Sequence, residues 1–208
     1  MRMRSNAVVA LSLAVLVSPA ALDAQGVRLG PTVGLNSATL GGDDAEGVDS
    51  RISWLLGGFV NFDISPNFAL QPELLYSRKG AKLDFDGNQA TLAVDYIEIP
   101  VLGQIRFPSQ SVTPYFLVGP ALSFKSGCEA QAESGGTEVS VDCSEIDINL
   151  KDTDFSLIGG VGIEIRNFTA SLRYDYGLSK VIDDAGEIDV FNRTITLAVG
   201  YAFRLGQN

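Results

Sequence analysis

Apolar residues recur at every second position in eight separate segments of this chain, and polar or small residues fill most of the positions between them. This alternation predicts β-strands that each have one apolar face. Each segment is close to the ~9–11 residues that a tilted strand needs to cross a bilayer. The segments are residues 27–36, 52–62, 68–79, 97–107, 115–125, 155–165, 168–176 and 194–203.

The connections between these segments alternate strictly between short and long. The short ones are residues 63–67, 108–111 and 166–167, and the long ones are roughly residues 37–50, 80–91, 126–153 and 179–193. This alternation places all short turns on one side of an up-and-down barrel, which is the periplasmic side in outer membrane barrels. We therefore expect an all-β fold, an eight-stranded antiparallel up-and-down transmembrane β-barrel with short periplasmic turns and long extracellular loops.

Aromatic residues on the apolar face support this threading. Six lie near the predicted periplasmic ends of their strands: Phe62, Phe68, Phe107, Phe168, Tyr201 and Phe203. Five lie near the outer ends: Trp54, Tyr76, Phe124, Phe155 and Tyr176. Two aromatic girdles that flank an apolar band are typical of the two interfaces of a membrane.

Four prolines, Pro31, Pro72, Pro100 and Pro120, lie inside the predicted strands. Proline cannot donate a hydrogen bond to a strand ladder, and a closed barrel has no edge strand to hold it. We expect each proline to remove a ladder hydrogen bond or to mark a β-bulge.

The first residues have the features of a secretory signal. Arg2 and Arg4 precede an apolar stretch over residues 7–21, and Ala24-Gln25 is a candidate cleavage point. The apolar stretch is shorter than the ~20 residues of a membrane-spanning helix. We divide the chain into a signal peptide, residues 1–24, and a single barrel domain, residues 25–208.

The chain is acidic, and its acidic residues gather in the predicted long loops. Removal of residues 1–24 changes the formal net charge from −10 to −11. Such a surface repels nucleic acid, which is not an expected partner. The loop acids form a solvated, repulsive surface or, alternatively, bind divalent cations weakly, since Ca²⁺ prefers clustered carboxylates. They are Asp43, Asp44, Glu46, Asp49, Glu129, Glu133, Glu138, Asp142, Glu145, Asp147, Asp152, Asp154, Asp183, Asp184, Glu187 and Asp189.

Two cysteines, Cys128 and Cys143, lie in one polar stretch. Export leads to an oxidising compartment, where a disulfide is expected. Closing a loop of this size stabilises the folded state by roughly 3 kcal/mol in the chain-entropy model.

Eight ionisable residues occupy the polar face and point into the predicted barrel: Arg28, Glu73, Lys79, Glu98, Arg106, Glu164, Arg173 and Asp175. An eight-stranded barrel is barely wide enough for side chains to fill it. A charge enclosed there must be paired and hydrogen-bonded. We predict an internal salt-bridge network in which Glu73 and Glu98 both approach Arg173; a gated ion or proton path is the alternative.

Three motifs resemble those of a known family: Gln71-Pro-Glu-Leu-Leu-Tyr-Ser77, Tyr96-Ile-Glu-Ile-Pro-Val-Leu102 and Pro114-Tyr-Phe-Leu-Val-Gly-Pro120. With Gly159-Gly-Val-Gly162, they are similar to the PorT-like outer-membrane β-barrel domain over about residues 26–206. The resemblance implies an eight-stranded barrel in the outer membrane of a Gram-negative bacterium, in contact with membrane lipid. The cysteine pair is not part of the family pattern.

No motif specifies a reaction. The chain has no histidine, which excludes Ser-His and Cys-His catalytic pairs, and no cofactor or metal site is predicted. We expect a non-enzymatic barrel with a structural or surface-interaction role, inserted by the barrel-assembly machinery with Phe203 as its terminal aromatic signal. The alternatives are a secreted, soluble, lipocalin-like barrel for a small apolar ligand and a narrow ion channel.

Overall fold

The computed structural model describes residues 26–42, 48–85, 88–134, 137–145, 150–180 and 190–205. The predicted signal peptide lies outside the described residues. Among those residues, no helix has the length and apolar character needed to cross a bilayer.

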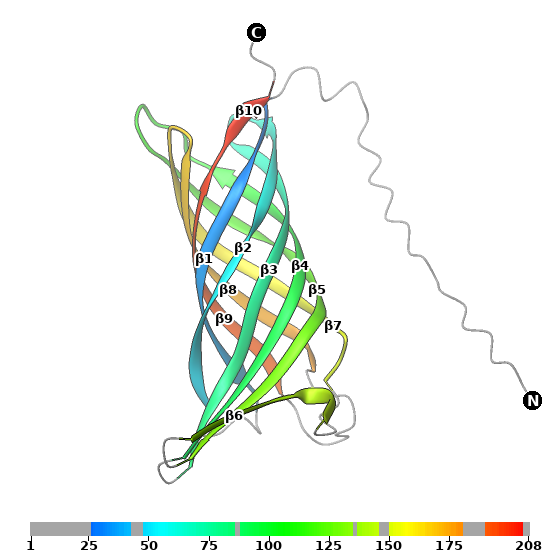
Figure 1. The fold of residues 1–208 in the computed structure, drawn as a ribbon. Helices are drawn as coiled ribbons and strands as arrows, with labels where there is room; N and C mark the ends of the chain where they lie inside the picture. Colours follow the sequence, from blue (N-terminus) through cyan, green and yellow to red (C-terminus); the bar gives the residue numbers. More distant parts are fainter. Residues whose placement is uncertain are drawn as a thin grey trace, which may run out of the picture.

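Eight long antiparallel strands wind into a closed barrel (Figure 1). They are β1 (Val27–Gly41), β2 (Val48–Ser65), β3 (Phe68–Phe85), β4 (Asn88–Arg106), β5 (Thr113–Ser134), β7 (Thr153–Ile165), β8 (Phe168–Lys180) and β9 (Phe191–Tyr201). Consecutive barrel strands pair with each other, and β1 pairs with β9 to close the ring, with Leu35 opposite Leu197. The short strand β10 (Phe203–Leu205) follows β9 and pairs with the start of β1. The predicted fold class is confirmed.

The alternation of the sequence becomes an alternation of inside and outside. Leu74 is 60% exposed and Leu197 is 54% exposed, whereas Glu73 and Arg173 are 4% and 7% exposed. Apolar side chains therefore cover the outer wall, and charged side chains line the lumen. A barrel of this kind is suited to the hydrocarbon core of a bilayer, where every backbone N–H and C=O group must be hydrogen-bonded within the sheet. The lipocalin-like alternative, which requires an apolar lumen, is wrong.

Several strands continue well beyond the barrel at the end opposite β10 (Figure 1). The β3–β4 ladder runs on to Phe85 opposite Asn88, and β5 continues to pair with a further strand, β6 (Thr137–Asp142). We call residues 81–85, 88–95, 127–134 and 137–142 the external sheet. The expected loops over 80–91 and 126–153 are thus largely strand. Polar composition misled the prediction, because a ladder that lies beyond the bilayer needs no continuous apolar face toward lipid.

The prolines do not mark bulges. Pro31 lies opposite Gly58, Pro100 opposite Ala121 and Pro120 opposite Leu157, within continuous registers. The register shifts fall elsewhere, between Ser50 and Leu55, Asp63 and Ser65, Asp95 and Tyr96, and Tyr176 and Lys180. Of the two expected outcomes, a β-bulge is therefore excluded at these three prolines, and the loss of a ladder hydrogen bond within an unshifted sheet remains.

The outward face yields a depth-dependent prediction. Leu197→Arg places a charge on the lipid face of β9 and should lower the free energy of unfolding by about 2–4 kcal/mol in lipid vesicles, as expected near a bilayer midplane. Leu205→Arg is the matched control, since Leu205 is equally exposed, at 54%, but lies in β10 at one end of the barrel. Urea titration of both variants measures the difference; equal costs would contradict the proposed depth.

Candidate functional site: the sealed lumen and the external hairpin

An ion pair between β3 and β8 crosses the lumen. The Arg173 guanidinium donates to both carboxylate oxygens of Glu73, with Nη1–Oε2 at 2.7 Å and Nη2–Oε1 at 3.0 Å. Gln71 Nε2 donates to Glu73 Oε1 at 2.6 Å, and Arg173 Nε donates to Ser171 at 2.9 Å. Bidentate, charge-assisted pairs of this kind are among the strong hydrogen bonds in proteins. The pair joins residues 100 positions apart in sequence.

A second group of charges surrounds Lys79. Its Nζ lies 2.5 Å from Asp175 Oδ2 and 2.6 Å from Glu98 Oε2. The prediction that Glu98 approaches Arg173 is therefore wrong in its partner, although Glu98 does point inward. Glu73 binds the Arg173 guanidinium with both oxygens, and the long Lys79 side chain reaches Glu98 instead.

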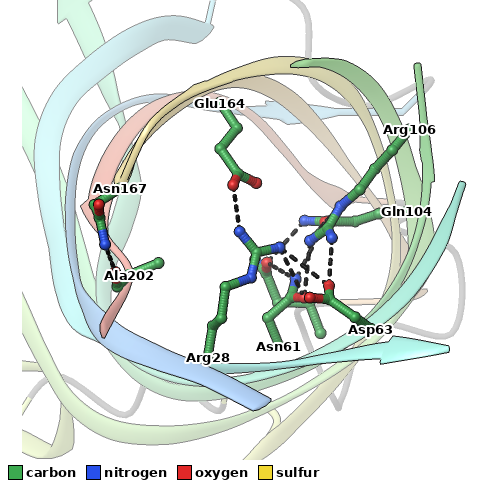
Figure 2. A network of polar contacts seen from close by, with 9 residues as sticks. Arg28, Asn61, Asp63, Gln104, Arg106, Glu164, Asn167 and Ala202 are labelled. Carbon is green, nitrogen blue, oxygen red and sulfur yellow. Dashed lines mark hydrogen bonds and ion pairs between the residues drawn. The ribbon is translucent and has the colours of Figure 1, made fainter. Parts of the chain in front are cut away.

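A third network closes the periplasmic end of the lumen. Arg28 lies between Glu164 on one wall and Asn61 and Asp63 on the other (Figure 2). Arg106 also donates to Asp63 and, at 2.8 Å, to Asn61 Oδ1. Two guanidinium groups thus share one carboxylate.

Sequence reasoning assigned Asp63 to a turn, so this shared carboxylate was missed. The structure places Asp63 in β2, on the same face as Asn61. Extending the polar parity of that strand by one step, from Asn61 to Asp63, would have identified it.

Apolar side chains fill much of the remaining lumen. One cluster comprises Leu102, Tyr115, Leu117, Ala121 and Ile158. These residues share the inward parity with the charged residues. Large apolar residues on the polar parity, such as Leu102, Leu117 and Ile158, are the signal that the sequence interpretation did not use. An eight-stranded barrel is expected to be filled in this way.

Further apolar residues cover the Lys79 group on its outer side. Val94 and Tyr96 of β4 pack with Leu150, and Leu40 and Leu92 lie against them. The polar lumen therefore ends in an apolar cluster at the mouth.

The aromatic residues predicted to form two girdles are all exposed or half-buried on the outer wall. Neighbouring rings contact each other, with centroids 5.5 Å apart for Trp54–Tyr76 and 4.9 Å for Phe168–Tyr201. Phe116 and Tyr174 also face outward and were not included in the girdles. Their positions at the membrane interfaces remain a prediction.

A disulfide joins Cys128 and Cys143, with a Cα–Cα distance of 5.5 Å. Cys128 precedes Glu129, which lies opposite Asp142 in the β5–β6 ladder, and Cys143 follows Asp142 directly. The bond therefore closes the base of the β5–β6 hairpin, which we call the external hairpin.

On the same hairpin, the Ser140 hydroxyl donates to the Glu129 carboxylate and lowers the pKa of Glu129 below its ordinary value. Stabilisation from this bond is present above the ordinary carboxyl pKa and is lost as the pH falls through the lowered value.

The predicted loop acids are only partly described. Asp43, Asp44, Glu46, Asp147, Asp183, Asp184, Glu187 and Asp189, and the side chains of Glu133 and Glu138, lie outside the described residues. Asp152 pairs with Lys125 at 3.0 Å. Asp154, expected in or near the loop, is instead buried in β7 and accepts from Asn192 Nδ2 at 2.7 Å. In the described part of the chain, no three Asp, Glu or Cys residues are grouped to hold a metal.

The central ion pair gives a stability prediction. Glu73→Ala leaves the buried Arg173 charge unpaired and should lower the free energy of unfolding by about 3–5 kcal/mol. Asp152→Ala breaks an ion pair whose carboxylate is exposed and should cost at most ~1 kcal/mol. Urea titration in lipid vesicles compares the two variants; similar losses would contradict a buried, paired Arg173.

The disulfide gives a local prediction. The double variant Cys128→Ser/Cys143→Ser should expose the external hairpin to proteases in intact cells, because the cross-link no longer restricts its unfolded states. The barrel should keep its compact form on an unheated gel. Cleavage rates of the variant and the oxidised wild type provide the measurement; equal rates would show that pairing with β5 alone holds the hairpin.

Comparison with known proteins places this architecture in a family. A family model described as "Outer membrane protein beta-barrel domain" matches residues 22–183. No curated protein matches the sequence significantly.

Three solved barrels are similar in fold. Ail, the attachment invasion locus protein of Yersinia pestis, is 17% identical, with 85% of this chain and 98% of that chain covered and a TM-score of 0.45. Neisserial surface protein A is 16% identical, with 84% and 97% covered and a TM-score of 0.46. OprG of Pseudomonas aeruginosa is 12% identical, with 86% and 96% covered and a TM-score of 0.46.

The family model spans well over half of the sequence, and the barrel presents the apolar wall that a bilayer requires. The chain belongs to the outer membrane protein beta-barrel domain family and is an integral β-barrel of the Gram-negative outer membrane.

Proposed function

We propose that this protein is a sealed outer membrane barrel with a structural role, which makes surface contacts through its external hairpin. The observation that carries the proposal is the set of ion pairs across the lumen. Charged networks centred on Arg28, Arg173 and Lys79 occupy successive levels of the interior. Apolar clusters fill the space beside and above them.

The energetics of these networks favour a plug over a channel. To open a path, the barrel would have to separate charges that are nearly fully buried. Breaking one such pair leaves an uncompensated charge, which costs several kcal/mol. The closed barrel wall also prevents the strands from moving apart without loss of ladder hydrogen bonds. The interior is therefore suited to fixing strand register and stiffness.

The same enclosure argues against catalysis. Glu73 and Glu98 are the carboxylates nearest the middle of the lumen, and both are bound to cations. A general acid or base must reach a substrate proton within hydrogen-bond distance. Neither carboxylate has that access, so we infer a non-enzymatic barrel.

The external hairpin is the element suited to contacts. It projects beyond the barrel, and the Cys128–Cys143 bond holds its base. The sequence places many of the acidic residues at this end of the barrel. A partner with a basic surface is favoured by charge complementarity.

The motifs that resemble PorT-like barrels support membership of that branch. Gln71 and Glu73 of the first motif and Glu98 of the second are buried in the lumen, where they bind each other or Lys79. These residues therefore serve the sealed interior. The aromatic girdles and Phe203 fit contacts with lipid and with the assembly machinery.

Conductance measurements test the seal. Purified protein inserted in planar bilayers should produce no steady unit currents, because the buried ion pairs block the lumen. The variant Glu73→Gln, which removes one of the buried charges, is measured in the same way. Its matched control is Glu145→Gln, which removes an exposed carboxylate outside the barrel. Regular current steps in the wild type would overturn the structural reading and favour the narrow channel.

Binding to a charged surface tests the contact role. Vesicles that carry the barrel should adhere to polylysine-coated beads at low salt and detach at high salt, since salt screens exposed charges. A variant with Glu129, Glu138, Asp142 and Glu145 changed to glutamine should adhere less. Equal adhesion of both proteins would exclude the external hairpin as the contact site.

A further inference from the structure

The charges of the lumen are balanced at two levels and unbalanced at the third. Arg173 faces Glu73, and the two arginines of the periplasmic network face the two carboxylates of Asp63 and Glu164. Around Lys79, by contrast, one cation meets Glu98 and Asp175, and Asp154 lies within electrostatic range of both Lys79 and Asp175. Arg193 is also within electrostatic range of Asp154, but its guanidinium lies over the Tyr176 ring on the outer wall. Among the described residues, the inward-facing side chains of this outer group therefore carry an excess of negative charge.

The same group contains four buried oxygen atoms that make no hydrogen bond to another group of the protein: Asp154 Oδ1, Ser156 Oγ, Asp175 Oδ1 and Thr194 Oγ1. Each aspartate uses its other oxygen, since Lys79 binds Asp175 Oδ2 and Asn192 binds Asp154 Oδ2. Ser156 and Thr194 are only 1% and 2% exposed. Buried polar atoms without a partner are rare, and a bound ion is one of the few explanations for them.

The strand register brings Ser156, Asp175 and Thr194 to one part of the wall. Asp175 lies directly opposite Thr194 in the β8–β9 ladder. Ile158 lies opposite Asp175 in the β7–β8 ladder, so Ser156, two residues away on the same face, is its diagonal neighbour. Opposite and diagonal residues on one face of a sheet are within reach of each other. Asn192, two residues from Thr194, connects Asp154 to this group.

We propose that Asp154, Ser156, Asp175 and Thr194 bind a Ca²⁺ ion inside the outer half of the lumen. Two carboxylate and two hydroxyl oxygens are hard donors, and Ca²⁺ takes six to eight oxygen ligands in flexible geometry, with water completing the shell. Its two positive charges match the excess of one lysine against three carboxylates. The ion ties β7, β8 and β9 together and, through Lys79, connects them to β3 and β4.

The site lies beneath the apolar cluster of Val94, Tyr96 and Leu150. Tyr96 also approaches the site, with its hydroxyl 3.5 Å from Asn192 Nδ2. An ion enclosed here exchanges slowly with solvent, which separates it from weak binding at the exposed loop acids.

The test uses the purified mature protein in detergent micelles. It is unfolded in urea with EDTA, then refolded with or without Ca²⁺ and passed through a Ca²⁺-free column. Elemental analysis should find one Ca²⁺ retained per chain, and the Ca²⁺-refolded protein should unfold at higher urea. Tb³⁺ in place of Ca²⁺ should show luminescence excited through tyrosine, and Tyr96→Phe should reduce it.

Two variants and one control make the assignment specific. Asp154→Asn and the double variant Ser156→Ala/Thr194→Ala should each weaken Ca²⁺ binding at least about tenfold. The double variant keeps every charge, so it remains informative if Asp154→Asn fails to fold. Glu145→Gln removes an exposed carboxylate outside the lumen and should bind Ca²⁺ as the wild type does.

Two results would overturn the proposal. One is a wild-type protein that retains no Ca²⁺ and unfolds at the same urea concentration with and without it. If the urea concentration of unfolding also depends on pH but not on Ca²⁺, then protons bound to the carboxyl groups around Lys79 balance the excess negative charge. The other is Ca²⁺ retention by both lumen variants equal to that of the wild type, which would place the ion at the loops.

Discussion

The structure depends on the closure of one sheet in a medium that cannot hydrogen-bond. Hydrocarbon outside the barrel forces the backbone groups into the strand ladders and allows only apolar side chains on the outer wall that it contacts. The lumen then receives the polar side chains, but it is too narrow to hydrate them freely. Arg173 and Glu73 must consequently find each other across the barrel. The charge networks follow from closure in lipid and need no separate functional cause.

This dependence explains what could be predicted from the sequence. The two-residue period identified the eight barrel strands and their inward face, because a shift of one residue would place Glu73 in lipid. Partners across the lumen were harder to predict. The alternation gives the direction of a side chain but not its height, which is set by strand tilt and register. For this reason Glu98 was assigned to Arg173, although Lys79 lies closer.

Prediction of the strands from the sequence failed most in the parts of the chain that lie outside the bilayer. The external sheet has no face toward lipid, so its strands lose the alternation that identified their membrane-spanning parts. The inward position of Asp63 was not predicted for a related reason, since Asp63 lies near the end of β2, where a turn begins. Asp154 resembles a loop acid in the sequence, although it is the first buried residue on the inward face of β7. Strand ends are therefore where sequence and structure differ.

The external hairpin and the lumen meet the same physical problem in different ways. Neither can rely on a hydrophobic core of ordinary size. The lumen replaces that core with buried charge pairs, whose strength comes from exclusion of water. The hairpin lies in water, where similar pairs contribute little, and Lys125–Asp152 is partly solvated. A covalent bond between Cys128 and Cys143 keeps its strength in water, which accounts for the position of the single disulfide of this chain outside the barrel.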